Sequence, residues 1–213
     1  MRDTFRPTLH TITARMHAPL HTLVAPCQHA MEIRKSRFVA HAAPVASAEQ
    51  ALAFLREVST PSASHNCWAY RIGADYRSND DGEPGGSAGR PILQAIEGQG
   101  MDRVMVIVTR WFGGIKLGVG GLIRAYGGTA AECLRRAGRI PIVAMTRLHV
   151  HCDFADAALL KARLAELGAS IESETGAADG MDLHLRVPTS RLADAQARIA
   201  AISRGRSVVK LVD

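Results

Sequence analysis

The hydrophobic and polar positions near the start of the chain predict two strands and then a helix. Residues 21–33 and 36–45 predict two strands that pair around the polar break between them. Ser47, with Gln50 three residues later, is a capping-box pattern that predicts a helix start. The apolar residues that follow lie at helical spacing and predict one buried face: Ala48, Ala51, Leu52, Leu55 and Val58.

The middle of the chain alternates between strands, turns and helices. Residues 66–72 alternate as a strand does, and residues 78–90 are rich in turn formers. A short helix is predicted over 91–98, because its first residue is a proline, which suits the first turn of a helix. The apolar run in 102–110 predicts a central buried strand, and residues 120–137 predict a second helix.

A second domain is predicted after the Gly-Arg-Ile-Pro punctuation at 138–141. Its pattern predicts, in order, strand, helix, strand, strand, helix and strand over 143–154, 155–168, 169–174, 181–187, 190–203 and 206–212. This βαββαβ order is that of the ferredoxin-like unit. The chain is therefore predicted to be α+β, with a mobile extension at 1–19, a first domain at 20–140 and a ferredoxin-like domain at 141–213.

The composition indicates a globular protein without a membrane span or a secretion signal. Of 213 residues, 47% are hydrophobic and 22% are charged. No apolar run approaches the ~20 residues that a membrane helix needs, and the N-terminal segment lacks an apolar signal core. The four cysteines form no C-x-x-C pair, which indicates reduced thiols in a cytoplasmic protein rather than disulfides or a zinc site.

Positive charge is concentrated in the first two-thirds of the chain. Residues 1–142 carry 17 Lys and Arg against 11 Asp and Glu, a net charge of +6, whereas residues 143–213 carry nine of each. A basic face favours anionic partners such as nucleic acid, and the plain alternative is an ordinary solvated surface.

The segment Arg110–Gly128, RWFGGIKLGVGGLIRAYGG, holds seven glycines between a predicted strand and a predicted helix. Free amides at a helix N-terminus and the helix dipole favour bound anions, and Lys116 lies within the loop. The specific nucleotide-binding signatures are absent. Leu117 stands where a P-loop has Ser or Thr, and Ile123 stands at the last glycine position of G-x-G-x-x-G.

We therefore predict a site for phosphate or nucleic acid around this loop, which becomes one basic groove if both glycine-rich loops lie on one side of the sheet. Its candidate residues are Arg90, Arg110, Gly113, Gly114, Lys116, Gly118, Gly120, Gly121 and Arg124. The alternative is that these glycines permit tight turns and close packing of helix on sheet.

Further groove contacts are predicted from neighbouring motifs: His65, Asp80, Asp81, Glu83, Trp111 and Phe112. The carboxylates either hold a divalent cation or form an acidic turn that pairs with arginines, and because EF-hand spacing is absent no metal site is assigned. The two aromatic residues either stack on bases or anchor the core. Neighbours at i and i+2, such as His65 and Cys67, rarely make a nucleophilic pair, so no catalytic residue and no cofactor are assigned.

Four segments together resemble the YigZ/IMPACT family. They are KSRF at 35–38, SHNCWAY at 64–70, DDGEPGGSAGRPIL at 80–93 and VTRWFGGIKLGVGGLIRAY at 108–126. The resemblance spans roughly residues 20 to 213, so the N-terminal extension lies outside it. It implies a first domain like the two-layer α/β second domain of a small-subunit ribosomal protein. It implies a second domain like the ferredoxin-like last domain of elongation factor G.

Two hypotheses about function follow from the resemblance and the charge. The first is a non-enzymatic, translation-associated protein that binds RNA or a ribosomal component through the basic face of the first domain. The second is an enzyme acting on a phosphorylated small molecule, with the 113–121 loop holding phosphate and the acidic loop supplying a metal or a base. The serines that related kinases carry in such a loop are missing from residues 119–121, which counts against the second hypothesis.

Overall fold

The computed structural model describes residues 19–212. All but the last residue of the extension predicted at 1–19 therefore lies outside the described residues. The chain divides after Ile142 into two compact units, and the second unit begins at Val143. The predicted boundary at 140 lies two residues from this division.

The first unit is built on one antiparallel sheet of five strands in the order β2-β3-β6-β4-β5. The strands are β2 (Cys27–Ile33), β3 (Ser36–Pro44), β4 (His65–Ile72), β5 (Asp75–Asn79) and β6 (Val104–Trp111). The central strand β6 is buried from Val104 to Arg110, which accounts for its nearly continuous apolar sequence. In β6, unlike a half-exposed strand, alternate side chains enter hydrophobic cores on both faces of the sheet.

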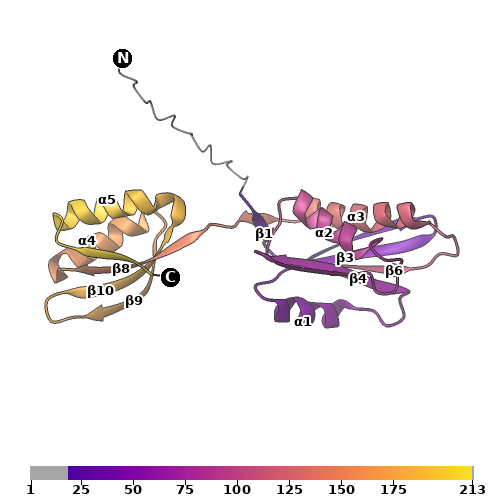
Figure 1. Ribbon diagram of the computed structural model, residues 1–213, viewed down its shortest axis with the longest axis horizontal. Coiled ribbons are helices and arrows are strands. Elements are labelled where there is room, and N and C mark those ends of the chain that lie inside the picture. Colours follow the sequence, from indigo (N-terminus) through magenta and orange to yellow (C-terminus); the bar gives the residue numbers. More distant parts are fainter. Residues whose placement is uncertain (1–18, 213) are drawn as a thin grey trace, which may run out of the picture. The chain divides into compact units, whose positions relative to one another are not determined.

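Helices cover both faces of this sheet (Figure 1). Helix α1 (Ala48–Val58) packs on one face, whereas α2 (Gly89–Gly98) and α3 (Val119–Arg136) pack on the other. The domain therefore has three layers, and the expected two-layer arrangement is wrong. The reason is that β6 presents Met105 and Ile107 to α1 as well as valines to the other helices.

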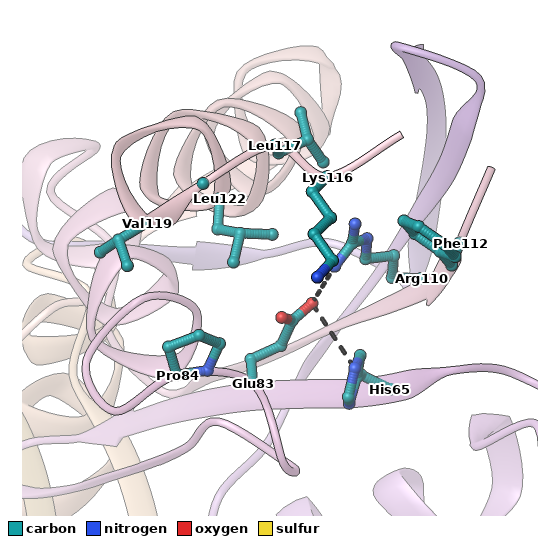
Figure 2. A pocket seen from close by; sticks show the side chains of 10 residues that line it. His65, Glu83, Pro84, Arg110, Phe112, Lys116, Leu117, Val119 and Leu122 are labelled. Carbon is teal, nitrogen blue, oxygen red and sulfur yellow. Dashed lines mark hydrogen bonds and ion pairs between the residues drawn. The ribbon is translucent and has the colours of Figure 1, made fainter. Parts of the chain in front are cut away.

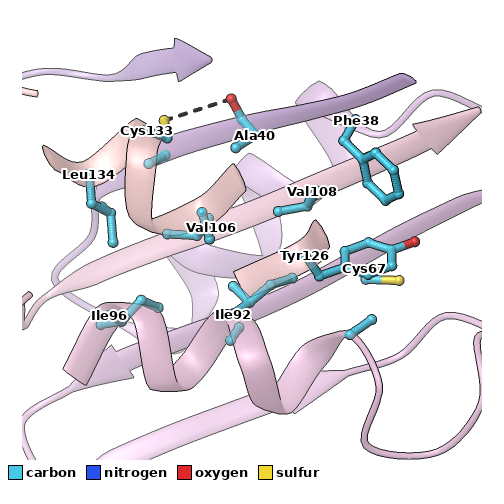
Figure 3. Packing of buried hydrophobic residues seen from close by; sticks show 14 of the residues in the cluster. Phe38, Ala40, Cys67, Ile92, Ile96, Val106, Val108, Tyr126, Cys133 and Leu134 are labelled. Carbon is cyan, nitrogen blue, oxygen red and sulfur yellow. Dashed lines mark hydrogen bonds between the residues drawn. The ribbon is translucent and has the colours of Figure 1, made fainter. Parts of the chain in front are cut away.

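The larger core lies between the sheet and the helices α2 and α3 (Figure 3). Ile92 and Ile96 of α2 and Tyr126 of α3 pack against Val106 and Val108 of the sheet. The ring of Tyr126 meets Phe38 edge to face, with ring centroids 5.2 Å apart. This packing fixes both ends of the Arg110–Gly128 segment, because β6 precedes the glycine loop and α3 follows it.

Two predicted elements of this domain differ from the structure. The single strand predicted over 21–33 is two strands in different sheets, because the chain bends at 24–25 before Pro26. The first of them, β1 (His21–Leu23), pairs with β7 (Arg139–Pro141). The edge strand β5 was not predicted, since its sequence DYRSN has no apolar alternation: residues 78–79 were placed in the turn-rich loop and residues 75–77 in no element. All five of its residues are exposed.

The second unit has the predicted βαββαβ order, with sheet order β11-β8-β10-β9. Its elements are β8 (Met145–Cys152), α4 (Phe154–Ala165), β9 (Ser170–Gly176), β10 (Met181–Pro188), α5 (Leu192–Ser203) and β11 (Val208–Val212). A single 3₁₀ turn at Thr189–Arg191 precedes α5. Both helices pack on one face of the sheet and enclose a core of its own, separate from those of the first unit.

Candidate functional site

The glycine loop between β6 and α3 lies directly against the β2–β3 turn. A Cβ atom at Gly113 would stand 1.9 Å from the backbone oxygen of Lys35, so only glycine fits this contact. Gly114 and Gly118 have φ angles of 84° and 71°, a region that other residues rarely adopt. The predicted alternative role of the glycines in tight turns and close packing thus holds at these three positions.

A pocket of about 380 Å³ opens beside this loop (Figure 2). Strand β4, the 80–88 loop, β6, the glycine loop and the first turn of α3 all contribute to it. Its lining residues are His65, Glu83, Pro84, Arg110, Phe112, Lys116, Leu117, Gly118, Val119 and Leu122. Segments far apart in the sequence therefore converge on one concave surface, as the shared groove required.

A buried ion pair forms the bottom of the pocket. The Nη1 of Arg110 donates to Glu83 Oε1 at 2.6 Å, and the two side chains are only 7% and 4% exposed. The hydroxyl of Tyr126 donates to the same oxygen at 2.7 Å. Arg110 was expected to offer a free positive charge to phosphate, but the structure uses that charge to neutralise Glu83. The Nε of Arg110 has no hydrogen-bond partner among the described residues.

His65 lies beside this pair with a defined tautomer. Its Nδ1 is 2.6 Å from the backbone oxygen of Asp81, and because a carbonyl only accepts, Nδ1 is the donor. The Nε2 atom faces Glu83 Oε1 at 3.9 Å. Cys67, two residues further on, is fully buried, and burial raises its pKa to about 12. A thiol in this state is a poor nucleophile, which agrees with the expectation that the two residues are not a catalytic pair.

The acidic loop that precedes α2 is organised by its own carboxylates. Asp80 accepts from the amides of Gly86, Ala88 and Gly89 at 2.8, 2.9 and 2.8 Å. Asp81 accepts from the amide of Asn66 at 2.5 Å. These contacts occupy the acidic side chains that the enzyme hypothesis required as metal ligands or bases. The predicted alternative, an acidic turn that pairs with an arginine, is therefore present: Asp80 organises the turn and Glu83 pairs with Arg110.

The N-terminus of α3 meets the pocket without a capping side chain. Gly118 is the N-cap residue, and the first turn contains no acidic residue and no side-chain cap. The amides of the first helical residues have no partner within a helix, so they are available to an anion at the pocket mouth. Gly120 and Gly121 lie in this turn, where a Cβ at Gly121 would approach Leu117 to 3.0 Å.

Four exposed cations surround the loop. Lys116 lines the pocket, and Arg34 and Arg124 line a neighbouring pocket of about 260 Å³ beside Leu117. Lys35 is exposed in the turn that Gly113 touches. None of the ion pairs found between residues 19 and 212 involves these four side chains, which we call the basic rim. Arg90 is exposed on the first turn of α2 and does not line the pocket.

The two neighbouring aromatic residues differ in exposure. Phe112 is 50% exposed and lines the pocket, and the Arg110 guanidinium lies 5.5 Å from its ring centre. Trp111 is half-buried and carries the Arg37 guanidinium 5.1 Å from its ring centre. Of the two, Phe112 is therefore the one placed to contact a ligand.

Sequence reasoning missed part of this site. Arg34 was treated only as part of a polar break between strands, and Lys35 only as part of that break and of the KSRF motif. The register of β2 with β3 is what places them beside the glycine loop and α3. The apolar walls were also missed, because the residue types of Pro84, Val119 and Leu122 do not themselves indicate a ligand, although all three lie within the quoted family motifs. Tyr126 appeared only as the last residue of a family motif, and its helical position is what directs its hydroxyl to Glu83.

The fold and site define a two-domain α+β protein with a ligand-sized pocket and a basic rim on its first domain. Among the described residues, no helix is long and apolar enough to cross a membrane.

Comparisons with known proteins identify the family. The Impact N-terminal domain matches residues 34–134, and the domain of unknown function DUF1949 matches residues 150–206. An IMPACT family member encoded in the pol 5′ region of Thermus thermophilus is 50% identical over 160 residues, covering 73% of this chain and 86% of that protein. IMPACT family member YigZ of Escherichia coli is 34% identical over 188 residues, covering 85% of this chain and 92% of YigZ. The chain belongs to the IMPACT family, as the four motifs implied.

Two further comparisons show how much of this chain is shared with other proteins. A crystallised hypothetical protein superposes with a TM-score of 0.69 at 31% identity, covering 93% of this chain and 99% of that one. Protein IMPACT of Homo sapiens is 38% identical over 105 residues, which is 44% of this chain but only 32% of the human protein. The bacterial relatives thus share both domains, whereas the human protein is mostly composed of sequence that this chain does not match.

Proposed function

We propose that this protein is a translation-associated, cytoplasmic RNA-binding protein whose RNA site is the basic rim and the pocket beside it. The basic rim is the observation that carries the proposal. Arg34, Lys35, Lys116 and Arg124 come from three separate segments, and the contact at Gly113 holds two of these segments together. Unpaired cations on one surface are what binding to a phosphate backbone requires.

The surroundings of the basic rim support RNA in preference to a simple anion. Phe112 presents an exposed ring beside the cations, and aromatic rings beside a basic surface are the means by which single-stranded RNA is bound. The free amides at the start of α3 add donors for phosphate oxygens. RNA in single-stranded form offers both the phosphates and the unstacked bases that this combination suits.

The expected relationship of the two domains to translation proteins is part of the same proposal. The second domain is proposed to share the fold of the last domain of elongation factor G, whereas the three layers of the first domain differ from the expected two-layer domain of a small-subunit ribosomal protein. A ribosomal component that exposes RNA is therefore the partner we favour. The alternative of an enzyme acting on a phosphorylated small molecule has less support, because Asp80 is engaged by amides of its own loop and Asp81 by the amide of Asn66 on β4.

Filter binding of a single-stranded RNA over a series of salt concentrations tests the proposal. We expect affinity to fall steeply with salt, because each phosphate contact that releases a counterion contributes about 0.7 to the slope of log K against log salt. Lys116→Gln with Arg124→Gln removes two contacts, so the slope should decrease by roughly 1.4.

The matched control removes two exposed cations away from the basic rim, Arg56→Gln with Arg77→Gln, which lie on α1 and β5. This variant has the same net charge as the test variant and should keep most of the wild-type slope. Equal losses in the two variants, or binding that does not respond to salt, would contradict an RNA site at the basic rim.

A further inference from the structure

The buried carboxylate of Glu83, at the bottom of the pocket, uses only one of its two oxygens in hydrogen bonds with described residues. Both hydrogen bonds of Glu83 and its ion pair with Arg110 involve Oε1, and His65 Nε2 faces the same oxygen at 3.9 Å. Oε2 has no hydrogen-bond donor among the residues that the structure describes. A carboxylate oxygen is an acceptor, so a ligand that reaches the bottom of this pocket must bring a donor.

The walls of the pocket are largely apolar. Pro84, Leu117, Val119 and Leu122 lie on one side, and the exposed ring of Phe112 lies at the mouth (Figure 2). A volume of about 380 Å³ is within the range of small-ligand pockets, and an extruded base fits such a pocket between apolar and aromatic side chains.

The mouth of the pocket supplies the opposite charge. The side chain of Lys116 extends toward the Arg110–Glu83 pair in Figure 2, and Gly118 and Val119 begin α3 at the same edge. Together they place a cation and free amides at the mouth, with an acceptor at the bottom. A ligand that carries a donor on an apolar ring and a phosphate on the other side matches this order of groups, and a nucleotide is such a ligand.

We propose that the pocket receives one extruded RNA base that presents an amino group to Glu83 Oε2, and that it discriminates against uracil. Adenine, cytosine and guanine each carry an exocyclic amine. Uracil has none: its base-pairing edge offers a single N3–H between two carbonyl oxygens, which a carboxylate acceptor would repel. This inference rests on the proposed RNA-binding function and deepens it, because it assigns base selectivity to a pocket that phosphate contacts alone would not need.

Oligocytidylate and oligouridylate of equal length test the inference directly. Both have the same backbone charge and a single-ring base. They differ at position 4, where cytosine has an amine and uracil an oxygen, and at N3, which carries a hydrogen only in uracil. We expect the wild-type protein to bind oligocytidylate at least about fivefold more tightly, the lower end of what one good base contact provides. Glu83→Gln should bring the ratio close to one, because an amide can present either a donor or an acceptor.

A second variant keeps the test informative if Glu83→Gln fails to fold for want of the Arg110 partner. Val119 is 53% exposed and lines the pocket, so Val119→Trp should fill the mouth without disturbing a core. Ile123, one turn further along α3, is 40% exposed and does not line the pocket, so Ile123→Trp is the matched control. We expect Val119→Trp to lose the preference for cytosine and Ile123→Trp to keep it.

The outcomes separate this inference from the function on which it rests. Salt-dependent binding of both oligonucleotides with equal affinity would overturn the base pocket and leave the basic rim intact. Loss of the cytosine preference in Ile123→Trp as well as in Val119→Trp would also overturn it, as would a preference that survives Val119→Trp. Absence of binding to either oligonucleotide would overturn the RNA-binding function and the pocket together.

Discussion

At the scale of single residues, the neighbouring thiols of Cys27 and Cys133 show how the fold changes the chemistry of a side chain. Their Sγ atoms are 3.6 Å apart, with Cys27 half-buried on β2 and Cys133 buried on α3. A hydrogen bond from the Cys133 thiol lowers the pKa of Cys27 to about 7, although partial burial acts in the opposite direction. The same contact and burial raise the pKa of Cys133. The Cys133 thiol therefore stabilises the Cys27 thiolate.

We expect Cys27 to be the most readily alkylated cysteine of the chain. Because the thiolate is the nucleophile, its reaction rate with iodoacetamide should rise through a midpoint near pH 7. Mass spectrometry of peptides after timed labelling measures this. Cys133→Ala removes the donor and should move the midpoint toward the ordinary value of 9.0. A midpoint that the substitution leaves unchanged would show that the contact does not control Cys27.

At the scale of elements, the loop before α2 depends on one carboxylate. Burial alone would raise the pKa of Asp80, but the amides of Gly86, Gly89 and Ala88 lower it below its ordinary value. A depressed carboxylate pKa means that Asp80 stabilises the fold at neutral pH, and that this contribution is lost as the pH falls from 3.8 through the folded-state pKa. The loop also carries Glu83 into the pocket, so its order affects the site.

Asp80→Ala should lower the free energy of unfolding by about 2–3 kcal/mol at pH 7, because three amides lose a charged acceptor. Urea titrations followed by circular dichroism measure the change. The difference from wild type should persist at pH 5 and shrink below pH 3.8. Glu97→Ala, at an exposed position of α2, should lower the free energy of unfolding by less than about 0.5 kcal/mol. A loss of the same size from Glu97→Ala would argue against a specific role for Asp80.

Elements with strong hydrophobic periodicity could be predicted from the sequence, and elements fixed by distant partners could not. The central strand and the whole βαββαβ order follow from local pattern. Strand β5 could not be predicted, because its place at the sheet edge depends on pairing with β4 and not on its own polar residues. The glycine loop and Lys116 were found from composition. The pairing of Arg110 with Glu83 was not, since local pattern does not tell which of three nearby carboxylates turns inward.

At the scale of the whole molecule, each of the two units has a hydrophobic core of its own. The basic rim and the pocket belong entirely to the first unit. The second unit carries equal numbers of basic and acidic residues over 143–213. Each unit should therefore fold without the other, and the first unit alone should carry the proposed RNA binding.

We expect a fragment of residues 1–142 to fold and to bind RNA within about threefold of the intact chain, a difference of about 0.65 kcal/mol in binding free energy. A fragment of residues 143–213 should fold but bind RNA at least tenfold more weakly. Thermal unfolding followed by circular dichroism checks folding, and filter binding checks affinity. Strong binding by the second fragment would place the RNA site in the ferredoxin-like domain instead.

The contact between Gly113 and the backbone of Lys35 has a consequence for the thermodynamics of recognition. It fastens the β2–β3 turn to the start of the glycine loop, so the cations on both are already in position before a ligand arrives. A surface assembled in advance loses little conformational freedom on association, and more of the interaction energy is left for affinity. By allowing this contact, Gly113 lowers the loss of conformational entropy when the charged side chains bind their ligand.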